Sequence, residues 1–104
     1  MPSDPRTLFK TYLIEKPERY QVSENRNAVA LLQFLGARGA HATDLYRQFT
    51  KIPREEVDSA LEQLKAAKLA ASLPMQSDYL WYALPEGKAF LQHYNAAMEY
   101  STFK

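Results

Sequence analysis

TDLYRQFTKIPREEVDSALEQLKAAKL, residues 43–69, is the stretch around which the rest of the chain is arranged. Leu45 and Phe49 lie four residues apart, and therefore on one face of a short helix that we expect Thr43 to cap. Apolar residues in 53–68 then recur at the three-and-four spacing of a second, amphipathic helix. Because very few residues separate the two, the stretch predicts two helices joined by a tight turn.

A short helix is predicted at the N-terminal end of the chain. Asp4 followed by Pro5 is a helix start signal, because a capping side chain precedes a proline in the first turn. Pro17 ends this helix near residue 16, and residues 18–27 are predicted to be a connector.

Residues 27–37 predict a further helix, which lies between the connector and the central stretch. It is apolar nearly all round, so we expect it to be central and buried. Ser23 or Asn25 is the expected N-terminal cap, and Gly39 is the expected left-handed residue at the other end.

After residue 69 the pattern changes from helix to strand. Residues 70–73 and 79–84 are short and apolar, and the second run is rich in aromatic residues that favour strands. The turn-like residues 74–78 between them complete a hairpin. Pro85 then opens a last helix.

The side chains of the second predicted strand alternate between two faces. If Leu80, Tyr82 and Leu84 face the core, Tyr79 and Trp81 are available as an interaction surface. Packing under a terminal helix is the alternative for these aromatic residues.

Two local motifs resemble those of a known class of regulators. EEVDSALEQLKAAKLAAS, residues 55–72, is similar to the V-x-x-x-L-x-x-L-x-x-x-G-L-V run of regulators of the MarR, ArsR and PadR types, with Lys68 where these usually have Gly. YALPEGKAFLQ, residues 82–92, resembles their Y-x-L-T-x-x-G-x-x-L junction, with Pro85 where Thr is frequent. Neither motif alone is specific, and the resemblance is carried by the order and spacing of the two.

The resemblance implies a winged helix-turn-helix, mainly α with a small β-hairpin, with additional N- and C-terminal helices. We expect one domain over residues 1–104, with an N-terminal helix and connector in 1–22, the helix-turn-helix and wing in 23–84, and the C-terminal helix in 85–104. It also implies a small transcriptional regulator that dimerises through its terminal helices and places two recognition helices in successive major grooves of double-stranded DNA.

Composition limits the alternatives. The 104 residues are 46% hydrophobic and 24% charged, which suits one globular domain, and they include no cysteine. No apolar run approaches the roughly 20 residues that span a membrane, and no signal peptide is recognisable, so we expect a cytoplasmic protein without membrane contact. His41 and His93 have no ligand spacing between them, so we expect no enzyme, no metal and no cofactor.

The terminal helices carry two apolar stripes that predict a homodimer. They are more apolar surface than a small three-helix core needs. The alternative is that both helices fold back over the core of one chain. The residues of the predicted dimer surface are Leu8, Phe9, Tyr12, Leu13, Phe90, Leu91, Tyr94 and Met98.

Cations around the predicted turn are candidates for phosphate contacts, and two polar residues of the second helix are candidates for base edges. The full predicted DNA-binding set is Arg47, Gln48, Lys51, Arg54, Ser59 and Gln63.

The acidic face of the second helix favours a different partner. Glu55 and Glu62 would point toward the groove and repel phosphates, and Asp58 lies alongside them. The alternative function is therefore a winged helix that uses this face to bind a basic protein.

Overall fold

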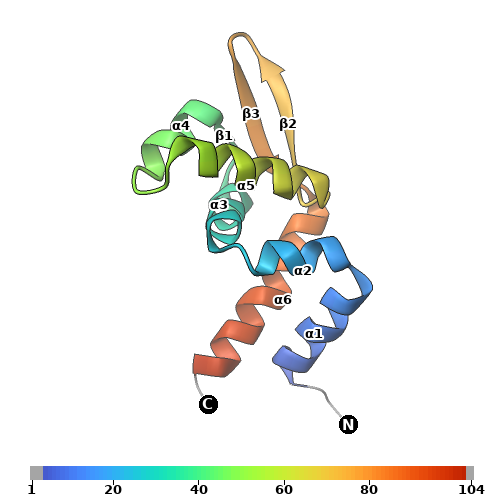
Figure 1. The fold of residues 1–104 in the computed structure, drawn as a ribbon. Coiled ribbons are helices and arrows are strands. Elements are labelled where there is room, and N and C mark those ends of the chain that lie inside the picture. The colour runs from blue at the N-terminus through green and yellow to red at the C-terminus, as the bar shows by residue number, and fades with distance from the viewer. Residues whose placement is uncertain (1–3, 103–104) are drawn as a thin grey trace.

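The computed structural model describes the backbone of residues 4–102 and the side chains of residues 4–100. The hairpin of β2 (Ala70–Met75) and β3 (Asp78–Ala83) projects at one end, and helices α1 (Pro5–Glu15) and α6 (Pro85–Thr102) extend at the other (Figure 1). The predicted fold class, a mainly α winged helix-turn-helix with additional terminal helices, is confirmed. Its elements in chain order are α1 (Pro5–Glu15), α2 (Pro17–Ser23), α3 (Arg26–Ala37), β1 (Ala40–His41), α4 (Ala42–Gln48), α5 (Arg54–Ala66), β2 (Ala70–Met75), β3 (Asp78–Ala83) and α6 (Pro85–Thr102).

Helix α3 is the centre of the core, as its apolar sequence predicts. Its Leu31 and Leu32 are completely buried, and they belong to one cluster with Leu64 of α5 and Phe90 of α6. Asn25 caps the helix, because its side-chain oxygen accepts hydrogen bonds from the backbone N–H groups of the first turn. Burial of each such leucine stabilises the fold by roughly 1.5–3 kcal/mol.

The connector predicted at residues 18–27 is wrong, because most of it forms helix α2. Pro17 stands in its first turn, and Glu18 there complements the helix dipole. Helix α2 packs against α3 and α5, where its Val22 is completely buried. With seven residues the helix depends on these contacts, which its local sequence does not indicate.

The sheet has three antiparallel strands in the order β1-β3-β2, one more than the predicted hairpin. In the hairpin, Ser72 pairs with Trp81, and Met75 with Asp78. The predicted long turn is therefore wrong: only residues 76–77 turn the chain, with Gln76 at a φ of 59°. The two-residue strand β1 pairs Ala40 with Trp81, a contact between distant segments that has no local signal.

Two predicted helix ends are also wrong. Helix α4 begins at Ala42, so Thr43 lies inside its first turn instead of capping it. The Thr43 hydroxyl instead donates a hydrogen bond to Asp78 of the hairpin. Gly39 does not have a left-handed conformation, because α3 ends at Ala37 and the chain continues extended through Arg38.

At Gly87, helix α6 lies very close to the backbone of Leu69, which is in the segment between α5 and β2. A Cβ atom on this residue would lie 2.1 Å from the carbonyl oxygen of Leu69 and 3.1 Å from the side chain of Leu32. Only glycine fits there, which gives a physical reason for the glycine of the junction motif.

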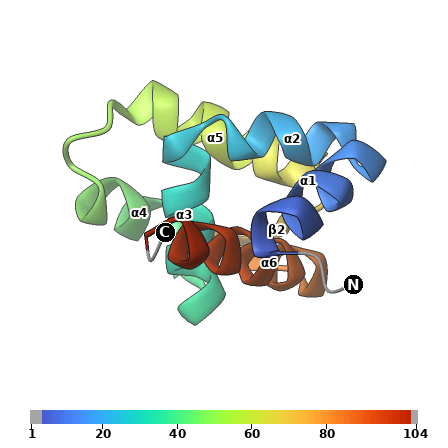
Figure 2. The same cartoon turned by 90° about the horizontal axis from the view of Figure 1, so that it is seen from below.

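Helices α1 and α6 run side by side (Figure 2), and Figure 1 shows them at the end of the molecule opposite the hairpin. The ring of Phe9 packs edge-on against Phe90, with centroids 5.8 Å apart. Arg19 of α2 is 6% exposed, donates a hydrogen bond to the Tyr12 hydroxyl at 2.7 Å, and pairs with Glu86 at 3.3 Å. This arginine therefore ties α1, α2 and α6 together.

Candidate nucleic-acid interface

Helix α5 has one buried face and one open face. Val57, Ala60, Leu61 and Leu64 are buried, as their spacing predicts. The residues of the opposite face are exposed along the whole helix. This open face consists of Glu55, Ser59, Glu62 and Ala66.

Cations gather where α4 turns into α5. Arg47 and Lys51 are exposed, as is the neighbouring Gln48. Arg54 begins α5, and its guanidinium carbon lies 4.5 Å from the centroid of the Tyr46 ring. Within the part of the chain that the structure describes, Arg47 and Lys51 form no ion pair with an acidic residue. Arg54, in contrast, is held by its cation–π contact with Tyr46.

Gln63 serves the fold rather than the open face. It is half-buried, and its Oε1 accepts a hydrogen bond of 2.7 Å from Nδ2 of Asn25. Since Asn25 also caps α3, this bond joins the start of α3 to α5. Of the two residues predicted to lie near base edges, Ser59 is exposed on the open face and Gln63 is not.

A second contact joins α4 to α5. The Tyr46 hydroxyl donates a hydrogen bond to Asp58, beside the guanidinium of Arg54. Burial of the Tyr46 ring, and next the hydrogen bond to Asp58, raise the pKa of the tyrosine. Sequence reasoning missed this pair because the two residues come from different helices.

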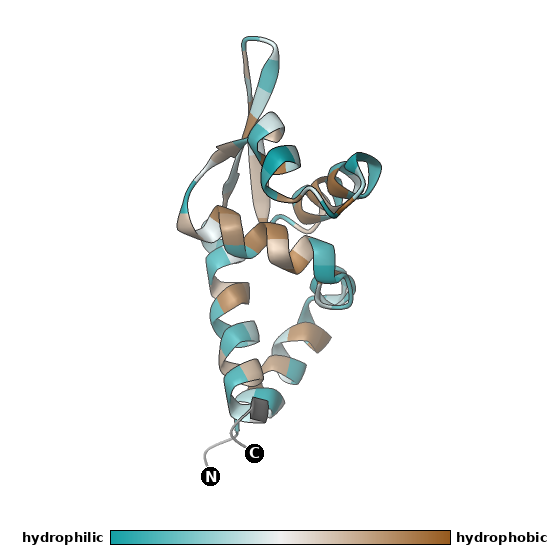
Figure 3. Cartoon of the chain, turned by 90° about the vertical axis from the view of Figure 1, so that its left-hand side faces the viewer, coloured by the Kyte–Doolittle hydropathy of each residue, from teal (hydrophilic) through white to brown (hydrophobic). Residues whose placement is uncertain are grey.

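The tip of the hairpin is fastened to α4. Oδ2 of Asp78 accepts hydrogen bonds from the Thr43 hydroxyl at 2.6 Å and from the Thr43 N–H at 3.4 Å. These bonds, the Thr43 hydroxyl first, together with the Tyr79 N–H, lower the pKa of Asp78. The tip itself is hydrophilic and carries no lysine or arginine (Figure 3).

The aromatic residues of β3 divide between core and surface. Trp81 is only 5% exposed, so the expectation that it forms an interaction surface is wrong. Trp81 belongs to the buried core cluster and lies on the face of the hairpin that is turned toward α5. Tyr79 is 54% exposed and remains available.

Most residues of the predicted dimer surface are buried or half-buried by contacts within one chain. Phe9, Leu13, Phe90 and Leu91 are each at most 8% exposed, and Tyr12 and Tyr94 are half-buried. The alternative, in which the terminal helices pack within one chain, accounts for these six residues. Leu8 and Met98 are exposed by 50% and 45%.

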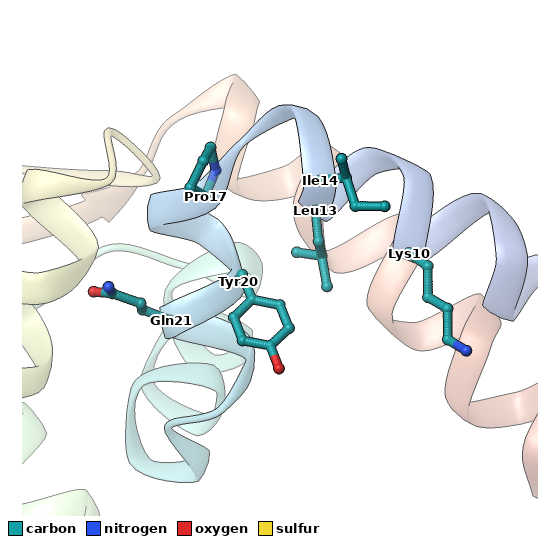
Figure 4. A pocket seen from close by; sticks show the side chains of 6 residues that line it. All are labelled: Lys10, Leu13, Ile14, Pro17, Tyr20 and Gln21. Atoms are coloured by element: carbon teal, nitrogen blue, oxygen red, sulfur yellow. The ribbon is translucent and has the colours of Figure 1, made fainter.

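An apolar groove lies in the angle between α1 and α2. Its volume is about 530 Å³, and Leu13 and the Tyr20 ring both project into that angle (Figure 4). Ile14 at its edge is 79% exposed. The complete lining is Lys10, Leu13, Ile14, Pro17, Tyr20 and Gln21.

No protein-family model matches this chain, and no curated protein matches it in sequence. Among the residues that the structure describes, no helix is long and apolar enough to span a membrane, and no group of three or more side chains is arranged to hold a metal ion. The order of the helices and strands is that of a winged helix-turn-helix fold.

Proposed function

We propose that this protein binds double-stranded DNA as a small winged-helix transcriptional regulator. The observation that carries the proposal is the open face of α5, which is exposed beside the hairpin and has the cations Arg47 and Lys51 at the adjoining turn. The order of helix-turn-helix, wing and last helix, with the two motifs in residues 55–92, supports it.

In the proposed complex α5 lies in the major groove. Arg47, Lys51 and the backbone N–H groups at the start of α5 contact phosphates, as happens where a helix N-terminus meets the DNA backbone. Ser59 faces base edges, and Glu62 accepts from a cytosine amino group. The homodimer remains a separate prediction, for which the exposed Leu8 is the remaining support.

The proposal predicts that the affinity for DNA falls steeply with salt concentration, and that Arg47 and Lys51 account for part of this dependence. In a fluorescence-anisotropy titration with random-sequence duplex DNA, we expect a dissociation constant on the order of 1–10 µM at low salt. Changing Arg47 and Lys51 together to alanine should weaken binding to every duplex and reduce the salt slope by about 2, since each phosphate contact contributes about one unit.

The matched control is the double variant Lys10→Ala and Lys88→Ala, which removes the same charge from the exposed surfaces of α1 and α6. It should bind DNA much more tightly than the turn variant. Equal losses in the two double variants would show that net charge alone drives binding, and would contradict the proposed face.

A second function is favoured by the acidity of the same face. Glu55, Asp58 and Glu62 are all exposed on α5, and Glu62 makes no hydrogen bond or ion pair with any residue described. Such a surface suits a basic protein partner. The variant Glu62→Lys separates the two functions, because it should strengthen non-specific DNA binding by a regulator and weaken the complex with a basic protein.

A further inference from the structure

A concave pocket separates α4 and α5 from the inner face of the hairpin. Its volume is about 450 Å³, within the range of small-molecule sites in proteins. Ala42, Leu61 and the buried Trp81 supply apolar lining, and polar groups of α5 and the hairpin tip complete it. The full lining is Ala42, Tyr46, Arg54, Asp58, Leu61, Glu62, Ser77, Asp78, Tyr79 and Trp81.

The charges that line this pocket do not balance. Asp58, Glu62 and Asp78 face the single cation Arg54, so the lining has a net charge of −2 when all four groups are ionised. Asp78 is engaged by Thr43, and one oxygen of Asp58 accepts from Tyr46, whereas Glu62 has no partner among the residues described. A cleft with apolar walls strengthens the field of such charges, so the pocket favours a cation and repels a phosphate.

The pocket also offers aromatic surface, which binds cations in its own right. Tyr46, Tyr79 and Trp81 all line it. Arg54 already shows this chemistry within the chain, because its guanidinium lies 4.5 Å from the centroid of the Tyr46 ring. The rings of Tyr79 and Trp81 have no cation of their own in the described structure.

We propose that this pocket binds a small organic cation, a guanidinium or alkylammonium compound. Its charge pairs with the carboxylate of Glu62 and the second oxygen of Asp58, and its alkyl part packs on the exposed ring of Tyr79. The combination of aromatic rings and carboxylates is the one that recognises ammonium ligands in other proteins. This inference does not depend on DNA binding, because it concerns the lining of the pocket alone.

Butylguanidinium and its neutral isostere butylurea test the proposal directly. Trp81 is the only tryptophan of the chain and lines the pocket, so its fluorescence reports on occupancy. We expect butylguanidinium to change the emission with a dissociation constant on the order of 1 mM, the affinity of an efficient ligand of this size. Butylurea should bind at least about tenfold more weakly. Equal binding of the two compounds, or no response to either, would overturn the proposal.

Two variants with opposite effects sharpen the test. Glu62→Gln should weaken binding of butylguanidinium about fivefold, the upper end for a partly exposed ion pair. Arg54→Gln should strengthen it, because the internal cation no longer competes. Glu55→Gln and Arg47→Gln are the matched controls, since they change the net charge equally outside the pocket. If each control behaves like its test variant, the effect is general electrostatics and the pocket site is refuted.

Discussion

Lys68 has a backbone conformation that suits glycine better than lysine. It follows α5 with a φ of 62°, and the next residue, Leu69, donates its N–H to the carbonyl of Leu64 at 2.9 Å. This is the arrangement in which a left-handed residue ends a helix. The resemblance of residues 55–72 to a motif with glycine at this place thus has a physical reason, and the lysine here carries local strain.

The strain predicts a stabilising substitution. Lys68→Gly should raise the free energy of unfolding by about 0.5–1 kcal/mol, measured by urea denaturation, because glycine adopts this conformation without a steric penalty. Lys65→Gly is the matched control within the last turn of α5, where glycine should lower the stability by about 1 kcal/mol. Destabilisation by both substitutions would refute strain at Lys68.

Single residues show where sequence reasoning succeeds. The caps Asp4 and Asn25 were predictable, because each bonds to the N–H groups of its own helix a few residues away. Thr43 and Gln63 were not, because their partners Asp78 and Asn25 lie 35 and 38 residues away. Local chemistry determines a cap, whereas the fold determines which distant polar group a side chain meets.

The same distinction holds for whole elements. The apolar spacing of α3 and α5 and the Pro85 start of α6 predicted these helices, because the pattern lies within each segment. Helix α2 and strand β1 were missed, since one depends on packing against α3 and α5 and the other on pairing with β3. The open face of α5 was predicted from its spacing, but the pocket beside the hairpin required the register of β3.

The bond between α4 and the hairpin predicts a dependence on pH. The pKa of Asp78 is lowered in the folded protein by Thr43, so its contribution to stability is present above the unfolded value of 3.8 and is lost as the pH falls through the lowered value. The thermal midpoint should therefore fall less in Asp78→Asn than in the native protein between about pH 5 and about pH 2.5.

The control for this experiment is Asp44→Asn, which removes an exposed acid from the first turn of the same helix α4. It should keep more of the native acid sensitivity than Asp78→Asn does. Identical pH profiles for the native protein and Asp78→Asn would show that the bond to Thr43 adds nothing to stability.

At the scale of the molecule, the division by shape does not coincide with the division by charge. The chain is elongated, with extents of 52 × 25 × 21 Å, and the hairpin and the terminal helices lie at opposite ends (Figure 1). Residues 1–54 contain nine Lys/Arg and five Asp/Glu, a net charge of +4, whereas residues 55–104 contain four and seven, a net charge of −3. The boundary between basic and acidic halves falls at the start of α5. The proposed DNA face thus combines a basic turn with an acidic helix.

The most direct test of the proposed DNA face is an NMR titration of the ¹⁵N-labelled protein with random-sequence duplex DNA at low salt. If α5 and the adjoining turn bind DNA, the amide chemical shifts will change around Arg47, Lys51 and the open face of α5. The shifts of α1 and of the far end of α6 will stay unchanged. Changes confined to the terminal helices, or no changes at all, would contradict DNA binding through α5.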